Sequence, residues 1–375
     1  MKILVLCYEY PPVGGGGGRL AAKVAEALVL RGHSVRAVSA GLRHLSRDEV
    51  TGGVRVLRPW SGRRREDTCS VPEMGLYLVT ALPEALRQAG SWKPDVIHAH
   101  FVVPTGLLAL ALNAASGIPY VLTAHLGDVP GGVPEQTSGL FRLAAPAARA
   151  VWKRAAGRTA VSGFVADLAQ KAFHVRPEVI LNGMPPIGPP QRGPRAPGQP
   201  LRLLMVGRLS IQKDPLLAIP ALARVRSLAW ELEVIGQGPL EAAMREKCQR
   251  AGLCGMIRFA GWLGEEEVRD RMRNSDVLLI TSSNEGLPMA AIEALWHGMA
   301  IVGSRIGGLA DVVEDGVSGL LCERTAEAFG AAIERVGEPA TLAAMRKRAY
   351  ERAALFDFGK SVDAYERVLA GALKR

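Results

Sequence analysis

Two glutamates in the stretch Thr281–Gly298 are separated by seven residues, in a setting that predicts a ligand site. Glu285 follows an apolar run of strand type, and Glu293 lies among good helix formers after Pro288, a residue tolerated in a first helical turn. Strand, loop and helix in this order place both acids near the carboxyl end of a strand, where open α/β sheets bind ligands. Two such acids can accept hydrogen bonds from two separate hydroxyl groups, and the backbone amides of Gly286–Leu287–Pro288 can donate to oxygen atoms.

Two cations follow the first predicted strand of the second half of the chain. Arg208 and Lys213 stand five residues apart in the sequence Gly-Arg-Leu-Ser-Ile-Gln-Lys-Asp. Arginine can bind two phosphate oxygens at once and lysine acts as a compact point charge. The spacing across a turn therefore suits one diphosphate, although two ordinary surface cations would give the same pattern.

Five consecutive glycines, Gly14–Gly18, come directly after the first predicted strand. Glycine allows a backbone to turn freely and to approach a ligand closely, and a helix N-terminus behind the run favours an anion. We expect this helix to begin at Leu20. Gly16 and Gly17 are the candidates for ligand contact, and Arg19 is a weaker candidate on the acceptor side; a merely flexible connector is the alternative.

His125 follows the predicted strand Tyr120–Thr123, in the sequence His-Leu-Gly-Asp that ends at Asp128. A histidine at this place serves either as a structural hydrogen-bond donor or as a site residue, and Asp128 is a candidate to act with it. His98 and His100 form an H-x-H pair that is compatible with a metal site. Since no cysteine or carboxylate cluster lies near them in the sequence, we favour a site without metal.

These features together resemble the retaining glycosyltransferases of family 4, which have the GT-B architecture. The resemblance rests on the E-x7-E of Glu285 and Glu293 and on the Gly-Arg…Lys segment, and it extends over nearly the whole chain. The family often has glycine after that lysine, where this chain has Asp214, and Pro-Glu where this chain has Ala310-Asp311.

The resemblance implies a role for each candidate residue. Arg208 and Lys213 would stabilise the leaving diphosphate without a metal ion, consistent with the absence of an Asp-x-Asp motif. Glu285 would hold the sugar hydroxyls and Glu293 the ribose hydroxyls. The glycine run would face the donor phosphates and the acceptor, and His125 would lie near the anomeric carbon. The implied catalytic residues are thus His125, Arg208, Lys213 and Glu285.

The implied activity is that of a hexosyltransferase, of EC 2.4 type, acting in glycan, glycolipid or polysaccharide synthesis. It would move a hexose from a UDP- or GDP-sugar to an acceptor hydroxyl with retained configuration and no cofactor. The acceptor is left open among a sugar, a lipid-linked molecule and a small metabolite. A glycosidase, a nucleotide-sugar epimerase of the same architecture and a non-catalytic binding or membrane-partner protein remain as alternatives.

Strand-type and helix-type segments alternate along the chain, which predicts an α/β fold of two doubly wound Rossmann-like domains facing a cleft. The expected parts are an acceptor-side domain at residues 1–186, a Pro/Gly-rich linker at 187–200, a donor domain at 201–355 and a helix at 356–375 that crosses back to the first domain. The predicted strands are Lys2–Cys7, Ser34–Ser39, Val54–Leu57, Asp95–Ala99, Tyr120–Thr123, Arg158–Val161, Glu178–Leu181, Leu201–Val206, Glu231–Ile235, Met256–Phe259, Val277–Ile280, Ala300–Val302 and Gly319–Leu321.

Composition is that of a globular protein, with 48% hydrophobic and 22% charged residues. Five scattered cysteines without a C-x-x-C pair predict reduced thiols and a cytoplasmic location. Most of the net charge of +10 lies in residues 1–186, with a dense group at Arg55, Arg58, Arg63, Arg64 and Arg65. Such a face suggests either a solvated charge run or peripheral contact with the inner face of a membrane. We expect no nucleic-acid partner.

Overall fold

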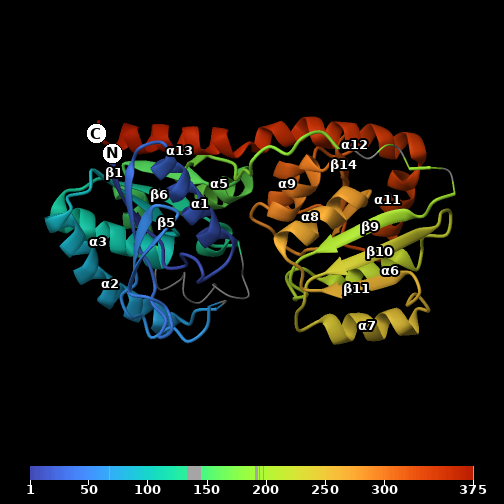
Figure 1. Cartoon of the computed structure of the whole chain (residues 1–375), viewed down its shortest axis with the longest axis horizontal. Helices are drawn as coiled ribbons and strands as arrows, with labels where there is room; N and C mark the ends of the chain where they lie inside the picture. The colour runs from blue at the N-terminus through green and yellow to red at the C-terminus, as the bar shows by residue number, and fades with distance from the viewer. Residues whose placement is uncertain (67, 133–144, 191–192, 194, 197, 375) are drawn as a thin grey trace. The chain divides into compact units, whose positions relative to one another are not determined.

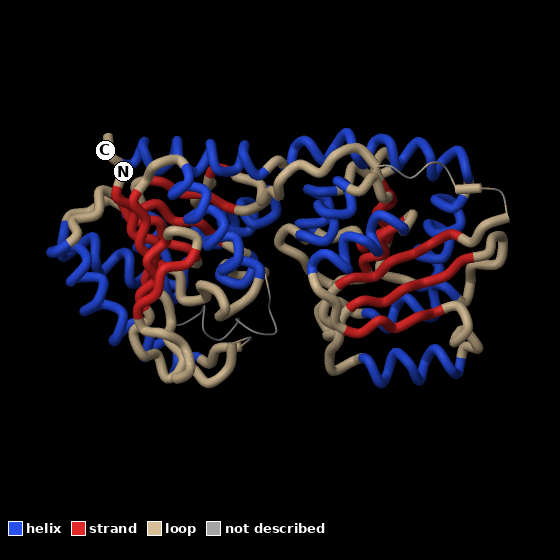
Figure 2. Tube along the Cα trace, in the orientation of Figure 1, coloured by secondary structure: helices blue, strands red, loops and turns tan. Residues whose placement is uncertain are grey.

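A computed structural model of the chain describes residues 1–66, 68–132, 145–190, 193, 195–196 and 198–374. It divides into two compact units, Met1–Asn182 with Lys360–Arg375, and Gly183–Gly359. Figures 1 and 2 show that helices flank a β-sheet in each unit. Among the described helices, none is both long and apolar enough to cross a bilayer.

The first unit contains an eight-stranded sheet in the order β3-β4-β2-β1-β5-β6-β7-β8. All neighbouring pairs are parallel except β3 and β4. The strands are β1 (Lys2–Leu6), β2 (Ser34–Val38), β3 (Asp48–Thr51), β4 (Val54–Leu57), β5 (Val96–His100), β6 (Tyr120–Ala124), β7 (Gly157–Ala160) and β8 (Glu178–Val179). The helices include α1 (Gly16–Leu30), α2 (Val71–Ser91), α3 (Leu107–Ser116), α5 (Gly163–Phe173) and α13 (Phe358–Ala372).

The second unit contains a six-stranded parallel sheet in the order β11-β10-β9-β12-β13-β14. The strands are β9 (Leu201–Val206), β10 (Trp230–Ile235), β11 (Ile257–Gly261), β12 (Val277–Ile280), β13 (Ala300–Ser304) and β14 (Gly319–Cys322). The helices are α6 (Ala218–Leu222), α7 (Glu241–Arg250), α8 (Glu265–Asn274), α9 (Met289–Trp296), α10 (Gly307–Val312), α11 (Ala326–Gly337) and α12 (Pro339–Ala353). Since β9 and β12 are neighbours, the loops that follow them emerge at one edge of the sheet.

The prediction of two Rossmann-like α/β units is confirmed, and each predicted strand is present with its ends within two residues of the prediction. Two local predictions are wrong. Strand β3 was not predicted, because its sequence, Asp-Glu-Val-Thr, has only one apolar residue and the strand lies at the exposed sheet edge. Helix α1 begins at Gly16 instead of Leu20, so Gly16 and Gly17 are the first helical residues.

Candidate active site

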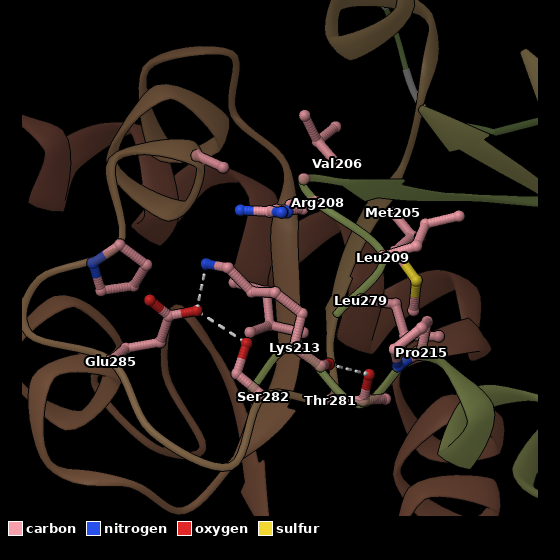
Figure 3. A pocket seen from close by; sticks show the side chains of 14 residues that line it. Met205, Val206, Arg208, Leu209, Lys213, Pro215, Leu279, Thr281, Ser282 and Glu285 are labelled. Carbon is pink, nitrogen blue, oxygen red and sulfur yellow. Dashed lines mark hydrogen bonds and ion pairs between the residues drawn. The ribbon is translucent and has the colours of Figure 1, made fainter. Parts of the chain in front are cut away.

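A pocket in the second unit brings Arg208, Lys213 and Glu285 together (Figure 3). Arg208 and Lys213 lie in the loop after β9, and Glu285 lies in the loop after β12. The Lys213 Nζ atom is 2.5 Å from Glu285 Oε1, and the Ser282 hydroxyl donates to the same oxygen at 2.7 Å. Figure 3 shows the Arg208 and Lys213 side chains extending toward the side on which Glu285 lies. We call this cavity the Lys213 pocket.

The Lys213–Glu285 pair is only partly shielded from water. The Glu285 side chain is 9% exposed and that of Lys213 is 34% exposed. A carboxylate that is largely removed from water needs a cation and hydrogen-bond donors, which Lys213 and Ser282 supply. The Lys213 side chain is the more exposed of the two, so a second anion can approach it.

Hydrogen bonds fix the two loops of the Lys213 pocket against each other. The Ser283 N–H donates to Gln212 O at 2.7 Å, and Gln212 Nε2 donates to Asn284 O at 3.0 Å. The Thr281 hydroxyl donates to Lys213 O at 3.1 Å. The cation loop and the acid loop therefore form one rigid frame, which restricts where the charged side chains can lie.

Asp214, which stands where the family often has glycine, and Gly308 each have a local structural reason. Asp214 adopts a left-handed conformation, φ 42° and ψ 56°, which aspartate accepts more readily than most residues and which glycine would also accept. Arg324 pairs with its carboxylate at 2.6 Å. A Cβ atom on Gly308, in the first turn of α10, would lie 2.1 Å from Gly286 O, so this glycine lets α10 approach the acid loop.

Glu293 lies on α9 and does not line the Lys213 pocket. Its Oε1 atom is 3.4 Å from Arg269 Nε of α8. The expectation that three backbone amides of Gly286–Leu287–Pro288 can donate is also corrected, because proline has no N–H group. Helix α9 begins at Met289 directly after Pro288, so its first-turn N–H groups supply further donors at this edge.

The glycine run of the first unit differs from residue to residue. A Cβ atom on Gly17 would lie 2.7 Å from Phe101 Cζ and 3.0 Å from His125 Nδ1, and one on Gly18 would lie 1.6 Å from Glu9 O. Among the described residues, and apart from the backbone of α1 itself, no atom lies within 4 Å of a Cβ atom placed on Gly16. The packing of the unit therefore explains Gly17 and Gly18 but leaves Gly16 without a structural reason to be glycine.

His125 is buried at the start of the turn after β6. Its Nε2 atom is 3.3 Å from His100 Nδ1, and its ring centroid is 4.4 Å from that of Phe101. Burial lowers the pKa of His125 to about 3, so the ring is neutral at neutral pH. A neutral imidazole offers one donor and one acceptor, which excludes His125 as a fixed positive charge.

Asp128 holds the backbone of this turn instead of facing solvent. Its carboxylate accepts hydrogen bonds from His125 N, at 2.7 Å, and from Val102 N. The residue is 2% exposed, and burial raises the pKa of its carboxyl group to about 8. Asp128 thus positions His125 and Val102, whereas Arg19 lies exposed on α1.

His98 and His100 are buried side by side in β5. The His98 Nε2 atom is 2.9 Å from Thr123 Oγ1, and the two ring centroids are 4.2 Å apart. Within the described part of the chain, no group of three or more His, Cys, Asp or Glu side chains is arranged to hold a metal ion. The pair is explained by packing and hydrogen bonding inside the sheet.

Three residues of these sites were not singled out from the sequence. Ser282 orients Glu285, Phe101 packs on His125, and Glu9 Oε2 accepts a hydrogen bond from Gly15 N at 3.3 Å. Phe101 has φ of 75°, an uncommon value for a bulky residue that often marks a functional site. The sequence carried no signal for that conformation, whereas Ser282 stood within the segment already chosen.

Two of the five arginines in the arginine-rich group of the first unit, Arg58 and Arg63, are buried, whereas Arg55, Arg64 and Arg65 are exposed. Arg55 Nη2 pairs with Asp48 Oδ2 at 2.6 Å, and the Arg58 side chain, 1% exposed, pairs with Glu49 Oε1 at 2.7 Å. Arg63 is buried and donates to the carbonyl oxygens of Tyr8, Arg65 and Glu66. Arg58 and Arg63 serve the fold, and the exposed Arg55 is paired with Asp48, so the density of positive charge in the sequence overstates the basic surface.

Comparisons with known proteins agree with this architecture. Residues 14–186 match the family model for Glycosyltransferase Family 4, and residues 191–354 match that for Glycosyl transferases group 1. The glycogen synthase of Mycobacterium tuberculosis H37Rv is 30% identical over 381 residues, which cover 96% of this chain and 91% of that protein.

Two solved structures share the fold. Sucrose-phosphate synthase from Thermosynechococcus elongatus superimposes with a TM-score of 0.82 at 20% identity, covering 98% of this chain and 99% of that one. Anabaena HepE, solved in complex with UDP and glucose, gives a TM-score of 0.74 at 18% identity and covers 99% of both chains. The chain therefore belongs to the glycosyltransferases of the family 4 kind and has the GT-B fold.

Proposed function

We propose that this enzyme transfers a hexose from a nucleoside diphosphate sugar to an acceptor hydroxyl, with retained anomeric configuration and without a metal ion. The observation that carries the proposal is the Lys213–Glu285 ion pair, 2.5 Å long, beside Arg208 at the carboxyl ends of β9 and β12. This pocket offers two cations and one carboxylate, which are the groups needed for a diphosphate and a sugar hydroxyl. The M. tuberculosis relative, named a glycogen synthase, and the Anabaena neighbour, solved with UDP and glucose, support a donor of this class.

The leaving group sets the first requirement. When the bond between the anomeric carbon and the β-phosphate oxygen breaks, negative charge grows on the diphosphate. Arg208 and Lys213 stabilise that charge, and the first-turn N–H groups of α9 add donors. Hydrogen bonds to charged groups contribute about 1.5–3 kcal/mol each, and more where they tighten as the charge develops.

Glu285 has two tasks in this proposal. Before the donor binds, it neutralises Lys213. When the diphosphate binds, the Lys213 ammonium group interacts with phosphate oxygens as well as with Glu285. The Glu285 carboxylate, still hydrogen-bonded to Ser282, then accepts hydrogen bonds from sugar hydroxyls. Glu293 binds the ribose hydroxyls, which requires its carboxylate to accept hydrogen bonds beyond the Arg269 contact.

The acceptor attacks from the side of the leaving group. A bond forms between the acceptor oxygen and the anomeric carbon as the bond to the phosphate oxygen breaks, and the acceptor proton passes to the departing phosphate. No protein nucleophile is required. His125, held neutral by burial, supplies a hydrogen bond near the sugar, and the open space beside Gly16 suits close approach of the donor or the acceptor.

A donor screen tests the proposal. The full chain is heated with UDP, GDP, ADP and their hexose derivatives, since a true donor nucleotide stabilises the fold by mass action. Stabilising donors are then incubated with and without sugar acceptors, with and without EDTA. We expect release of the nucleoside diphosphate that depends on acceptor and resists EDTA, and NMR of the product to show the donor's anomeric configuration.

Each part of the proposal has its own contrary result. An inverted product contradicts retention, and loss of turnover in EDTA that Mg²⁺ or Mn²⁺ restores contradicts metal independence. An isomerised donor without transfer indicates an epimerase, and hydrolysis of oligosaccharides without any donor indicates a glycosidase. Absence of stabilisation by every nucleotide contradicts the donor class.

A further inference from the structure

A hollow centred on Trp60 lies in the first unit between residues 41–47 and 58–64. It has two adjoining parts of about 350 and 430 Å³, which share Leu42, Arg43 and Trp60. Pockets of about 300–1,000 Å³ are the usual size for small-molecule ligands. Trp60, which is 49% exposed, lines both parts of this hollow, which we call the Trp60 pocket.

The Trp60 pocket is built by two loops that are fastened to each other. Strands β2 and β4 are parallel neighbours, so the segments after them leave the same edge of the sheet. Gly41 N donates to Pro59 O at 2.9 Å, and the Ser61 hydroxyl donates to Gly41 O at 2.9 Å. A Cβ atom on Gly41 would lie 2.7 Å from Arg58 O, so glycine is needed for this close approach. The indole of Trp60 is therefore held on a fixed backbone.

Buried arginines join the Trp60 pocket to the segment before the glycine run. Arg58 Nη1 donates to Tyr10 O at 3.2 Å, and Arg63 Nη1 donates to Tyr8 O at 3.4 Å. Gly14 N in turn donates to Glu66 O at 2.6 Å. The pocket is thus structurally continuous with the glycine run, to which the proposed function assigns contact with the reacting sugars.

Exposed cations line the Trp60 pocket. Arg43 lines both of its parts, Arg47 one and Arg64 the other, and all three are exposed. Among the described residues, neither Arg43 nor Arg47 forms an ion pair, and the carboxylate of Glu49 pairs with Arg58. An indole face with guanidinium groups around it matches a sugar ring that carries an anionic group. The ring packs on the indole, and the planar guanidinium binds two oxygens of a phosphate or carboxylate.

We infer that the Trp60 pocket binds the acceptor, and that this acceptor is a sugar bearing a phosphate or carboxylate group. The inference rests on the proposed function, because it names the acceptor of the same transfer. An anionic membrane surface is the competing partner for exposed arginine and tryptophan. The structure favours the sugar, because the cations surround a hollow of ligand size and three of the arginines expected on a basic face, Arg55, Arg58 and Arg63, are ion-paired or buried.

The test compares acidic and neutral sugars on the full chain. The probes are glucose, glucose 1-phosphate, glucose 6-phosphate and glucuronate, the corresponding mannose and galactose compounds, and a short polyprenyl diphosphate sugar in detergent. Binding is measured by calorimetry without donor, and KM is measured with the donor found in the nucleotide screen. The variants are Arg43→Gln with Arg47→Gln, and Trp60→Ala with Trp60→Phe in case alanine disturbs the fold. Arg87→Gln, which removes one charge from an exposed ion pair on α2, is the control.

We expect one acidic sugar to bind at least tenfold more tightly than its neutral counterpart. The Arg43/Arg47 double variant should raise the KM of that acceptor at least tenfold, which corresponds to about 1.4 kcal/mol, while the donor KM stays unchanged. Trp60→Ala should weaken acidic and neutral sugars alike, and Arg87→Gln should change neither. Tighter binding of the free sugar acids or of the polyprenyl diphosphate sugar shows whether the anionic acceptor is a free sugar or a lipid-linked one.

Several results would overturn the inference. Equal use of neutral and acidic sugars, or equal behaviour of the Arg43/Arg47 variant and Arg87→Gln, would contradict an anionic acceptor. Binding of phosphatidylglycerol vesicles that depends on Arg43, Arg47 and Trp60, with no binding of any sugar acid, would assign the pocket to a membrane. If the chain binds no nucleotide, the proposed function fails, but the calorimetry without donor still decides whether the pocket holds a sugar acid.

Discussion

The two candidate sites of this glycosyltransferase differ in the charge of the side chains that form them. In the second unit, Arg208, Lys213 and Glu285 are charged and lie where water reaches at least one of them. In the first unit, His125 and its neighbour His100 are buried and neutral. The difference matches two separate chemical tasks, since a departing diphosphate needs fixed positive charge, whereas the neutral hexose that is transferred needs hydrogen-bonding groups without net charge.

The largest effect is expected when a charged side chain of the Lys213 pocket is removed. Lys213→Ala and Glu285→Ala should each lower turnover at least a hundredfold, about 2.7 kcal/mol in activation free energy. Lys213→Ala should also destabilise the second unit by about 1–3 kcal/mol, because it leaves the Glu285 carboxylate, with a side chain 9% exposed, without its cation. Steady-state kinetics and urea unfolding measure the two effects.

The double variant Lys213→Ala/Glu285→Ala is the control for this pair. It should recover most of the lost stability and none of the turnover, because no buried charge then remains unpaired. Turnover within tenfold of the wild type in either folded single variant would contradict the assignment of the Lys213 pocket.

The next expected effect is a difference between the two units in the pH dependence of their stability. Burial lowers the pKa of His98 and of His125 to about 3, and it also lowers the pKa of His100. The stability that the three rings give is therefore present above about pH 6.5 and is lost as pH falls through their folded-state pKa values. Asp128 acts in the opposite direction, since its raised pKa gives stability below about pH 4 that is lost as pH rises through 8. Between pH 4 and 6.5 the unfolded state therefore binds up to two more protons than the folded state. The free energy of unfolding then falls by up to about 2.7 kcal/mol for each unit by which the pH is lowered.

Hydrogen exchange at pH 7 and pH 5 measures this difference unit by unit. The second unit contains one histidine with a lowered pKa among the described residues, His297, and should lose less protection. His98→Gln keeps a hydrogen-bonding side chain toward Thr123 and removes one titrating group, so it should flatten the pH dependence of the first unit. Equal loss of protection in both units at pH 5 would show that burial does not keep these rings neutral.

The charged site was largely predictable from the sequence, and the neutral site was not. Arg208, Lys213 and Glu285 each follow a recognisable apolar strand, and neighbouring parallel strands bring such loops together. For His125, the sequence showed a position after a strand but not burial, which depends on Phe101 and His100 packing around it. The tertiary environment sets the pKa of the ring, so its neutral state could not be predicted from neighbours in sequence.

The glycine run and the arginine group show the same limit. Because every position of Gly14–Gly18 is glycine, the sequence could not show that Gly17 and Gly18 pack closely against other residues while Gly16 faces open space. The sequence of the arginine group likewise could not show that Arg58 and Arg63 are buried, because charge density in a sequence does not tell which way a side chain points. The fold class, in contrast, followed from strand and helix alternation alone, which is repeated in both units.

A matched pair of glycine variants tests the first unit, with an expected change of about tenfold in a substrate KM or in turnover. The methyl group of Gly16→Ala meets no atom of the described residues outside the α1 backbone, and alanine in a helix is favoured by up to about 1 kcal/mol, so the variant should be at least as stable as the wild type. If a substrate approaches Gly16, the added methyl group should still raise a substrate KM or lower turnover about tenfold. Gly17→Ala presses on Phe101 and His125 and should lose both stability and activity. Full activity of Gly16→Ala would remove Gly16 from the site.

The smallest expected effect concerns Glu293, a proposed donor ligand whose side chain does not line the Lys213 pocket. If Glu293 binds ribose hydroxyls, Glu293→Ala should weaken the nucleoside diphosphate three- to tenfold, about 0.7–1.4 kcal/mol, and should scarcely weaken its 2′,3′-dideoxy analogue. Arg269→Ala removes the ion-pair partner of Glu293, 3.4 Å away, but leaves the carboxylate, so it should preserve the preference for ribose. Calorimetry of the wild type and the two variants with both nucleotides gives the six affinities needed. Equal weakening of both nucleotides by Glu293→Ala would assign Glu293 to holding α8 against α9, and the ribose would then need another partner.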